Sequence, residues 1–263
     1  MEIFQTIQNS TNTNCISEKQ HTHSKTNKKT THSTPENLQV LFEDNHIIVL
    51  NKRPGDIVQG DKTGDTPLSE ITKAYLAKKY NKPGAVYLGV VHRLDRPTSG
   101  VIVFARTSKA LPRLNKSFAE RQTKKTYWAV VKNSPPKDSD TLTHYLKRNP
   151  KQNKSYANTK EVPDSKKAIL HYHVLKKMQR YIALEILLET GRHHQIRAQL
   201  ASINCPIKGD LKYGFDRSNK DGSIHLHARK LSFMHPVKKE EMTITAPVPE
   251  DVLWENCISD MSK

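Results

Sequence analysis

Apolar residues are distributed unevenly along the chain, and their pattern changes at Leu38. Residues 1–37 consist mainly of Thr, Asn, Ser, Lys and His, with too few apolar side chains to offset the conformational entropy that folding removes. We therefore expect residues 1–37 to form a disordered, basic and polar tail. Residues 38–255 contain recurring apolar runs, and we expect them to form one folded domain.

Short apolar runs rich in β-branched residues predict a series of strands. Such runs cover residues 41–43, 47–50, 86–91, 101–105, 127–131, 169–174, 181–188, 226–233 and 242–245. Between them, residues 132–167 are polar and contain four prolines, which favours an insertion or a mobile surface segment.

Helical spacing of apolar residues appears in three places. The first follows Asp65-Thr66-Pro67, where Thr66 suits a cap and Pro67 the first helical position, and it extends to Lys79. The second follows Ser108, and the third follows Gly191 and ends before Pro206. Because strands outnumber helices and many connections are short, we predict an α+β fold with a mixed, largely antiparallel central sheet flanked by helices.

Charge points to a polyanionic partner. The chain has 43 Lys and Arg against 26 Asp and Glu, a net charge of +17. A pI near 9.7 is typical of proteins that bind nucleic acid, although lysine-rich surfaces also serve solubility alone. The three cysteines have no C-x-x-C spacing, which argues against a disulfide framework and a thiolate zinc site. No apolar run is long enough to cross a membrane, and we expect a cytoplasmic protein.

A polar loop between two predicted buried strands is the best candidate for a site. It runs from His92 to Gly100 and contains Asp95. Rigid scaffolds often hold catalytic groups on such loops. The alternative is that Asp95 only accepts hydrogen bonds from amides of the turn that follows it.

Four motifs that follow one another along the chain decide between a catalytic and a turn-stabilising role for Asp95. They are His92-Arg93-Leu94-Asp95 with Thr98-Ser99-Gly100, then Lys125-Thr126-Tyr127, then Gly191-Arg192-His193-His194-Gln195-Ile196-Arg197, and finally Leu226-His227-Ala228 through His235-Pro236. Weaker matches are Asn51-Lys52-Arg53-Pro54-Gly55 and Gly209-Asp210-Leu211-Lys212-Tyr213-Gly214. This set resembles the RluA-type RNA pseudouridine synthases from about Leu38 to Pro249, without an S4 domain.

The resemblance implies an isomerase that converts uridine in ribosomal or transfer RNA to pseudouridine, with no cofactor and no metal. It implies that Asp95, Tyr127 and Arg197 are catalytic. A carboxylate can act as nucleophile or stabilise positive charge at the sugar, as in glycosidases. A buried carboxylate needs a nearby cation to stay ionised, for which Arg197 is the candidate, and Tyr127 offers a ring face and a proton relay.

Further residues of these motifs are candidates for substrate binding. His92 and Arg93 are expected to fill the space that a flipped-out uridine leaves. The resemblance adds Thr98, Arg192, His194, Gln195 and Leu226 to the substrate-binding set. Basic residues between 106 and 125 suggest a track for phosphates, although an ordinary solvated helix face has the same composition. The basic residues expected to form this track are Arg106, Lys109, Arg113, Lys116, Arg121, Lys124 and Lys125.

Departures from the family pattern concern the substrate more than the chemistry. His193 stands where threonine is usual, Gln199 where a histidine often occurs, and Arg53 interrupts the early motif. The main alternative is an RNA-binding assembly factor that keeps the fold without using the catalysis. A nuclease is disfavoured because neither a carboxylate cluster for two metal ions nor a glycine-rich phosphate loop is found. We expect a monomer.

Overall fold

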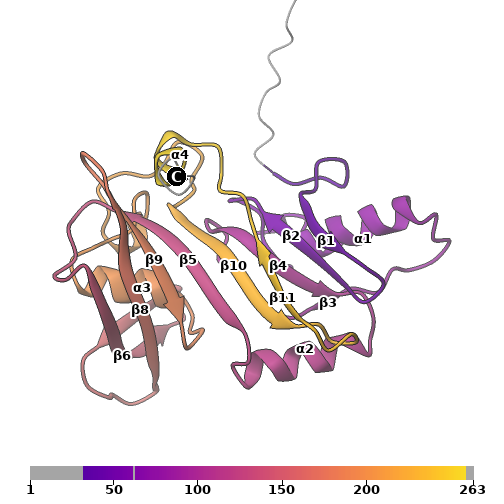
Figure 1. The fold of residues 1–263 in the computed structure, drawn as a ribbon, viewed down its shortest axis with the longest axis horizontal. Coiled ribbons are helices and arrows are strands. Elements are labelled where there is room, and N and C mark those ends of the chain that lie inside the picture. Colours follow the sequence, from indigo (N-terminus) through magenta and orange to yellow (C-terminus); the bar gives the residue numbers. More distant parts are fainter. Residues whose placement is uncertain (1–31, 62, 259–263) are drawn as a thin grey trace, which may run out of the picture. The chain divides into compact units, whose positions relative to one another are not determined.

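An 11-stranded sheet runs through the part of the chain that the computed structural model describes, residues 32–61 and 63–258 (Figure 1). Its strands are β1 (Val40–Glu43), β2 (Ile47–Lys52), β3 (Gly89–Val90), β4 (Ser99–Ala105), β5 (Lys124–Val131), β6 (Ser139–Asn149), β7 (Lys154–Asn158), β8 (Ser165–Lys177), β9 (Ile182–Leu188), β10 (Leu226–Met234) and β11 (Glu241–Thr245). The helices are α1 (Leu68–Lys79), α2 (Ala110–Ala119), α3 (Gln195–Ser202) and α4 (Val252–Ile258), with a 3-10 turn η1 at Leu211–Tyr213.

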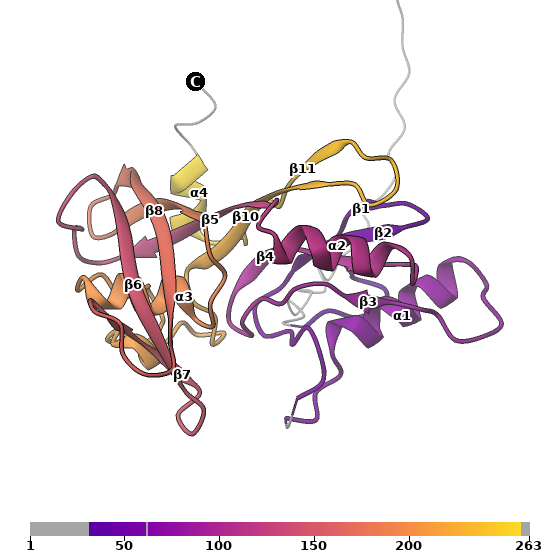
Figure 2. The ribbon, with the colours of Figure 1, turned by 90° about the horizontal axis from the view of Figure 1, so that it is seen from below.

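The predicted α+β class with a mixed, largely antiparallel sheet is confirmed. The spatial order is β1-β2-β4-β10-β5-β9-β8-β6-β7, with β3 beside β4 and β11 beside β10. Figure 2 shows β11 running along β10. Every strand pair is antiparallel except β10 with β4. This parallel pair joins the two halves of the sheet, and the loop of Asp95 enters β4 there.

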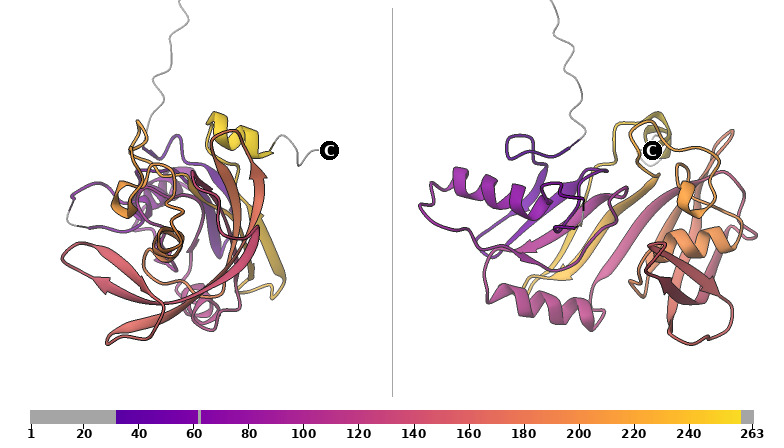
Figure 3. Two further views of the ribbon diagram at one scale, coloured as in Figure 1. Left: turned by 90° about the vertical axis from the view of Figure 1, so that its left-hand side faces the viewer. Right: turned by 180° about the vertical axis from the view of Figure 1, so that it is seen from behind.

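The helices cover both faces of the sheet. Alternate residues of β2 and β4 pack in one cluster with α1 and in another with α2, so these two helices lie on opposite faces. Likewise, alternate residues of β5 pack with α3 and with α4. Strand pairing puts Tyr127 on the face covered by α1 and α3, and its side chain packs against both of their clusters. Figure 3 shows α1 and α3 on this face, with β5 between them.

Gly100 allows the parallel pair to form. Its φ of +116° lies in the region that L side chains rarely adopt. A Cβ atom at this position would lie 2.3 Å from the carbonyl oxygen of Ala228 on β10, far inside contact distance. The tight approach of β4 to β10 at the end of the Asp95 loop therefore requires glycine.

Residues 132–167, for which we expected an insertion or a mobile surface segment, form regular strands, so the expectation of a mobile segment is wrong. This segment contains β6, β7 and the start of β8, and β6 pairs along its length with β8. Leu142, His144 and Leu146 alternate toward the interior, while the intervening side chains are polar and more exposed. Because one face of these strands is solvated, only alternate positions need to be apolar, and the segment as a whole looks polar. The four prolines lie in the connections, outside the strands.

Local details differ from prediction at the ends of elements. Pro67, not Thr66, occupies the cap position of α1, and no side chain caps this helix. At α2, Ser108 does not act as cap; the Thr107 hydroxyl accepts a hydrogen bond from the Ala110 amide. The sequence pattern does not predict helix α4.

Residues 1–31 of the predicted tail, which spans residues 1–37, lie outside the residues that the structure describes. The described chain begins at residue 32, before the predicted domain boundary. Ser33 is buried, and its amide and hydroxyl donate hydrogen bonds of 3.0 and 2.6 Å to the two carboxylate oxygens of Asp56. A partner so distant in the sequence is not visible in local composition.

Candidate active site

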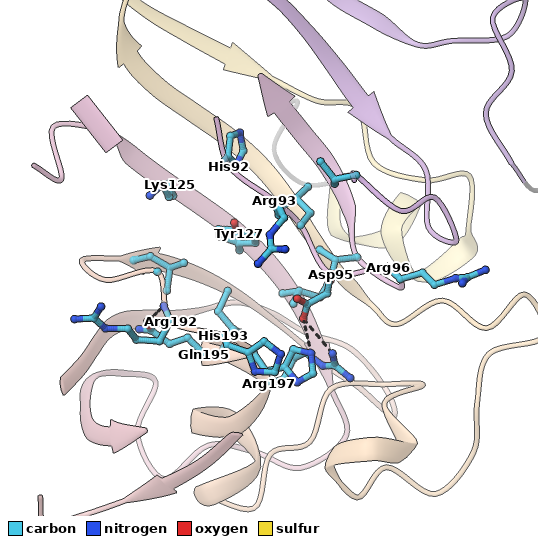
Figure 4. Close-up of a pocket in the computed structure, with 18 of the residues that line it drawn as sticks. His92, Arg93, Asp95, Arg96, Lys125, Tyr127, Arg192, His193, Gln195 and Arg197 are labelled. Atoms are coloured by element: carbon cyan, nitrogen blue, oxygen red, sulfur yellow. Dashed lines mark hydrogen bonds and ion pairs between the residues drawn. The ribbon is translucent and has the colours of Figure 1, made fainter. Parts of the chain in front are cut away.

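A cavity of about 1030 Å³ opens between the two halves of the sheet, and every residue predicted to be catalytic or to bind the substrate base lines it. The Asp95 loop forms one wall, β5 contributes Tyr127, and the segment entering α3 forms the opposite wall. The close-up in Figure 4 shows the Asp95 carboxylate in contact with Arg197 at the edge of this cavity. The four main sequence motifs therefore come together in one place.

Asp95 is held by a buried arginine. Nη1 of Arg197 donates a hydrogen bond of 3.0 Å to Oδ2 of Asp95. The same guanidinium donates through Nε and Nη2 to both carboxylate oxygens of Asp210, at 2.7 and 2.9 Å. Arg197 and Asp210 are almost fully buried, whereas the Asp95 side chain is 27% exposed. One carboxylate thus anchors the arginine and the other faces the cavity.

Arg197 is a permanent cation in this setting. Burial by itself would lower the pKa of Arg197, but hydrogen bonds and charge from Asp210, joined by Asp95, raise it above its ordinary value. The guanidinium carbon also lies 5.0 Å from the centre of the Tyr213 ring, a favourable cation–π distance. The two carboxylates and one arginine leave this group with a net charge of one minus.

A buried lysine secures the backbone of the Asp95 loop. Nζ of Lys52 donates hydrogen bonds to the carbonyl oxygens of Arg53, Arg96 and Thr98 at 2.9, 3.1 and 2.8 Å. Burial lowers the pKa of Lys52 to about 7, against the opposing charges of Asp56 and Asp95. Three carbonyl acceptors match the three N–H donors of an ammonium group. Lys52 therefore links the end of β2 to both sides of the turn after Asp95.

Tyr127 lies on β5 at the cavity wall. Burial, reinforced by the charge of Asp95, raises the pKa of the Tyr127 hydroxyl well above its ordinary range. The phenol is therefore protonated at neutral pH. Its ring packs against the core clusters on either side of the cavity.

The two residues expected to occupy a vacated base position differ in their environment. His92 stacks on Phe118, with ring centres 4.8 Å apart, and its Nε2 accepts a hydrogen bond from the Val103 amide at 3.1 Å. Burial lowers the pKa of His92 to about 3, so the ring is neutral. Arg93 is exposed and extends toward Tyr127, whereas Arg96 extends away from Asp95 (Figure 4).

The other predicted binding residues lie on the walls. The Gln195 amide oxygen accepts hydrogen bonds from the Thr190 hydroxyl and the Arg192 amide, at 2.8 and 3.0 Å, so Gln195 holds the loop that carries Arg192. Thr98 is buried, and its amide donates to the Asp95 carbonyl at 3.0 Å. Leu226 is buried and is an apolar residue in the wall of the cavity.

The structure brings only part of the predicted phosphate track to the cavity. Arg121 and Lys125 line the cavity, but the other basic residues of that segment do not. Arg106 is buried in an ion pair with Glu43 at 3.0 Å, and Arg113 donates to the Pro236 carbonyl. The cations around the cavity come from several elements: Arg93, Arg96, Arg121, Lys125, Arg148, Arg192 and Lys212.

Several site residues have no role assigned from the sequence. Asp210, Lys52 and Tyr213 lie in motifs that match only weakly, and that match is the available signal. Arg148 and Asn153 belong to the hairpin of β6 and β7, whose sequence resembles an insertion. The structure brings Arg148 and Asn153 to the cavity, and it places Asp210, Lys52 and Tyr213 in contact with residues that line it.

Within residues 32–61 and 63–258, no group of three or more His, Cys, Asp or Glu side chains is arranged to hold a metal ion. No helix in the same residues has the length and apolar character needed to cross a membrane.

Comparison with known proteins identifies the family. A family model described as RNA pseudouridylate synthase matches residues 46–202. The chain belongs to this family. The ribosomal large subunit pseudouridine synthase D of Xanthomonas campestris is 35% identical over 237 residues, covering 84% of this chain and 70% of that protein. The ribosomal large subunit pseudouridine synthase C of Buchnera aphidicola is 34% identical over 220 residues, covering 81% and 67%.

Solved structures support the fold of this pseudouridine synthase. Human RNA Pseudouridylate Synthase Domain Containing 4 superposes with a TM-score of 0.68 at 22% identity, covering 85% of this chain and 93% of the human chain. The family and its named relatives are enzymes, isomerases of RNA. Catalysis is therefore supported over the alternative of an assembly factor without required activity.

Proposed function

We propose that this pseudouridine synthase isomerises a uridine of large-subunit ribosomal RNA, with Asp95 as the catalytic carboxylate. The observation that carries the proposal is the ion pair of Asp95 with a buried arginine, inside a cavity large enough for a nucleotide. The names of the relatives favour ribosomal over transfer RNA. We further propose that the enzyme acts in the cytoplasm as a monomer.

The reaction breaks the bond from the ribose to N1 of uracil and forms a bond from the same sugar carbon to C5. Asp95 acts as nucleophile at the sugar or at the base, or stabilises positive charge at the sugar. Arg197 orients the Asp95 carboxylate without neutralising the group, because Asp210 balances the charge of the arginine. C5 then loses a proton and N1 gains one, so no cofactor or metal is needed.

Tyr127 holds the uracil ring by its face and passes on the C5 proton. Because its pKa is raised, the neutral phenol can accept that proton only if it releases its own at the same time. A nearby acceptor is the Asp95 carboxylate, whose charge contributes to the raised pKa. Tyr127→Phe should therefore lower kcat more than it weakens RNA binding.

Phosphates of the RNA bind the cations that surround the cavity. Flipping a uridine out of a folded RNA costs a few kcal/mol, which these contacts offset. Arg93 is the better candidate to occupy the vacated position, because it is exposed while His92 is held by the Val103 amide and Phe118. Leu226 offers the base an apolar contact, and Thr98, Gln195 and Arg192 shape the loops on either side.

The proposal is tested by mapping pseudouridine across total RNA from cells with and without the gene. Restoring the wild-type gene should recover every lost position, whereas Asp95→Asn should recover none. Asp216→Asn is a matched control, because Asp216 is an exposed aspartate paired with Lys132 at the surface. In vitro, Asp95→Asn should bind RNA normally yet release no tritium from RNA that carries the label at C5 of uridine. An unchanged map in the deleted strain would refute the proposed function.

A further inference from the structure

Two hydrogen bonds lead from the backbone of β7 to His194, whose ring lies next to the Asp95 carboxylate. The Ser155 amide donates to the Tyr213 hydroxyl oxygen at 2.8 Å. That hydroxyl lies 3.0 Å from Nδ1 of His194. Nε2 of His194 lies 3.6 Å from Oδ2 of Asp95. Ser155, Tyr213 and His194 are all buried, so water does not compete freely for these contacts.

The hydrogen bond from the Ser155 amide sets the direction of the hydrogen bond between Tyr213 and His194. A backbone amide can only donate, so the Tyr213 oxygen is its acceptor, and the phenolic proton is free to be donated to Nδ1 of His194. Burial lowers the pKa of His194 to about 3, despite the opposing charge of Asp95, so the ring is neutral and holds one proton. If Nδ1 is an acceptor, that proton is on Nε2, facing Asp95.

The opposite tautomer is disfavoured on two counts. With the proton on Nδ1, the Tyr213 oxygen would accept twice, and its own proton would have no acceptor among the described residues. In addition, the lone pair of Nε2 would face a carboxylate oxygen 3.6 Å away. Both penalties are avoided when Nε2 carries the proton.

We propose that Tyr213 and His194 are positioning residues that present an N–H donor to Asp95, with the direction of the relay set by the Ser155 amide of β7. The proposal rests on the proposed function in taking Asp95 as the catalytic group. Arg197 and His194 then both approach Oδ2. No described residue donates a hydrogen bond to Oδ1, so Oδ1 is the oxygen left to react.

A neutral donor suits this position better than a second cation. Arg197 is already shared between two carboxylates, which leaves the group with a net negative charge. A charged imidazole would cancel that charge and weaken the attraction to positive charge developing at the sugar. A neutral N–H restricts the orientation of the carboxylate without removing its charge.

The outer end of the relay is fixed by further contacts. Nζ of Lys212 donates to the carbonyl oxygens of Gln152 and Asn153, at 3.2 and 3.3 Å. The His193 ring lies within hydrogen-bond distance of the side chains of Asn153 and Ser155, and stacks on His194 with ring centres 3.8 Å apart. The hairpin of β6 and β7 is thereby tied to the wall that carries the relay.

The first test is the protonation state of the His194 ring in the free wild-type enzyme. Nitrogen-15 NMR of labelled histidines distinguishes the two ring nitrogens, and the His194 signals are those absent from His194→Gln. We expect a protonated Nε2 and a hydrogen-bonded, unprotonated Nδ1. In Tyr213→Phe the Nδ1 signal should move to that of a nitrogen without a donor. A proton on Nδ1 in the wild-type enzyme would overturn the proposal.

The second test is kinetic. His194→Ala and Tyr213→Phe should lower kcat by about 10- to 100-fold, as loss of an orienting partner does at other sites, with RNA Kd unchanged within about threefold. His194→Gln should recover most of the activity, because its amide can place an N–H near the position of Nε2. Tyr156→Phe, an exposed tyrosine on the same strand as Ser155, is the matched control. Wild-type kcat in His194→Ala would overturn the proposal.

The two tests separate the relay from the proposed function. If the wild-type enzyme forms no pseudouridine in any RNA offered, the function fails, while NMR still decides the tautomer. If the wild-type enzyme is active and His194→Gln is no better than His194→Ala, the N–H donor is not what His194 provides, and the relay is refuted.

Discussion

Asp210→Asn should destabilise the protein far more than a surface aspartate would. Asp210 accepts two hydrogen bonds from Arg197, and both side chains are almost fully buried. Asparagine keeps the shape of the side chain but removes the charge and puts an amide N–H₂ donor where a guanidinium donor already points. Among the described residues, Arg197 would then keep Asp95, which is 27% exposed, as its one acidic partner.

The size of the effect follows from removing one partner of a buried ion pair, which costs about 3–5 kcal/mol. We expect the lower end of this range, because Asp95 still offers Arg197 a carboxylate. For a domain of this size each kcal/mol lowers Tm by about 2–4 °C, so Tm should fall by roughly 6–12 °C. The loss is a large share of the roughly 5–15 kcal/mol that usually stabilises a folded domain.

Urea denaturation followed by circular dichroism measures the change in the free energy of unfolding. Asp216→Asn makes the same substitution in a pair that is 57% and 66% exposed, and it should change the free energy of unfolding far less than Asp210→Asn does. If Asp210→Asn were no more destabilising than Asp216→Asn, the buried pair would contribute little. Arg197 would then need another explanation for its position.

Three further perturbations test other parts of the structure. Burial lowers the pKa of Lys52 in the folded state, so the stability of the wild type relative to Lys52→Met should rise as pH increases from about 7 toward 10.5. Urea midpoints of the two proteins measure this difference. A difference that does not change with pH would show that Lys52 is not desolvated. Gly100→Ala should lower Tm strongly or prevent folding, since its Cβ would meet the backbone of β10 at 2.3 Å, whereas Gly84→Ala, with open space around it, should not. Arg148→Ala should reduce the slope of log RNA affinity against log salt by about 0.7–0.9, and Lys116→Ala, on the exposed face of α2, should leave it unchanged. Equal slopes for these last two variants would exclude the hairpin from phosphate binding.

The segment of β6 and β7 shows where local pattern failed. Its alternation of Leu142, His144 and Leu146 is short, and the residues between them are polar because they face solvent. These strands gain stability by pairing with β8 and by a hydrogen bond from the Gln199 side chain of α3 to the His144 ring. Neither partner can be recognised from the composition of the segment itself.

The structure gathers only part of the predicted phosphate track at the cavity, for a related reason. A run of basic residues in the sequence does not specify which side chains reach the same surface. Arg106 turned inward to Glu43, while Arg148 and Lys212, distant in the sequence, reached the cavity. Charge is a property of composition, but its placement depends on which elements meet.

The sequence by itself determined the class of fold, the family and the choice of Asp95 as the candidate catalytic group. Periodicity and the spacing of motifs can be read along the chain without any tertiary contact. Tertiary structure alone decided which groups surround that carboxylate. Asp210 anchors Arg197, Lys52 holds the loop, and the amide of Ser155 orients Tyr213 and His194. Each of these roles depends on burial and on a partner far away in the chain, and burial is what makes a hydrogen bond or an ion pair strong enough to orient a side chain.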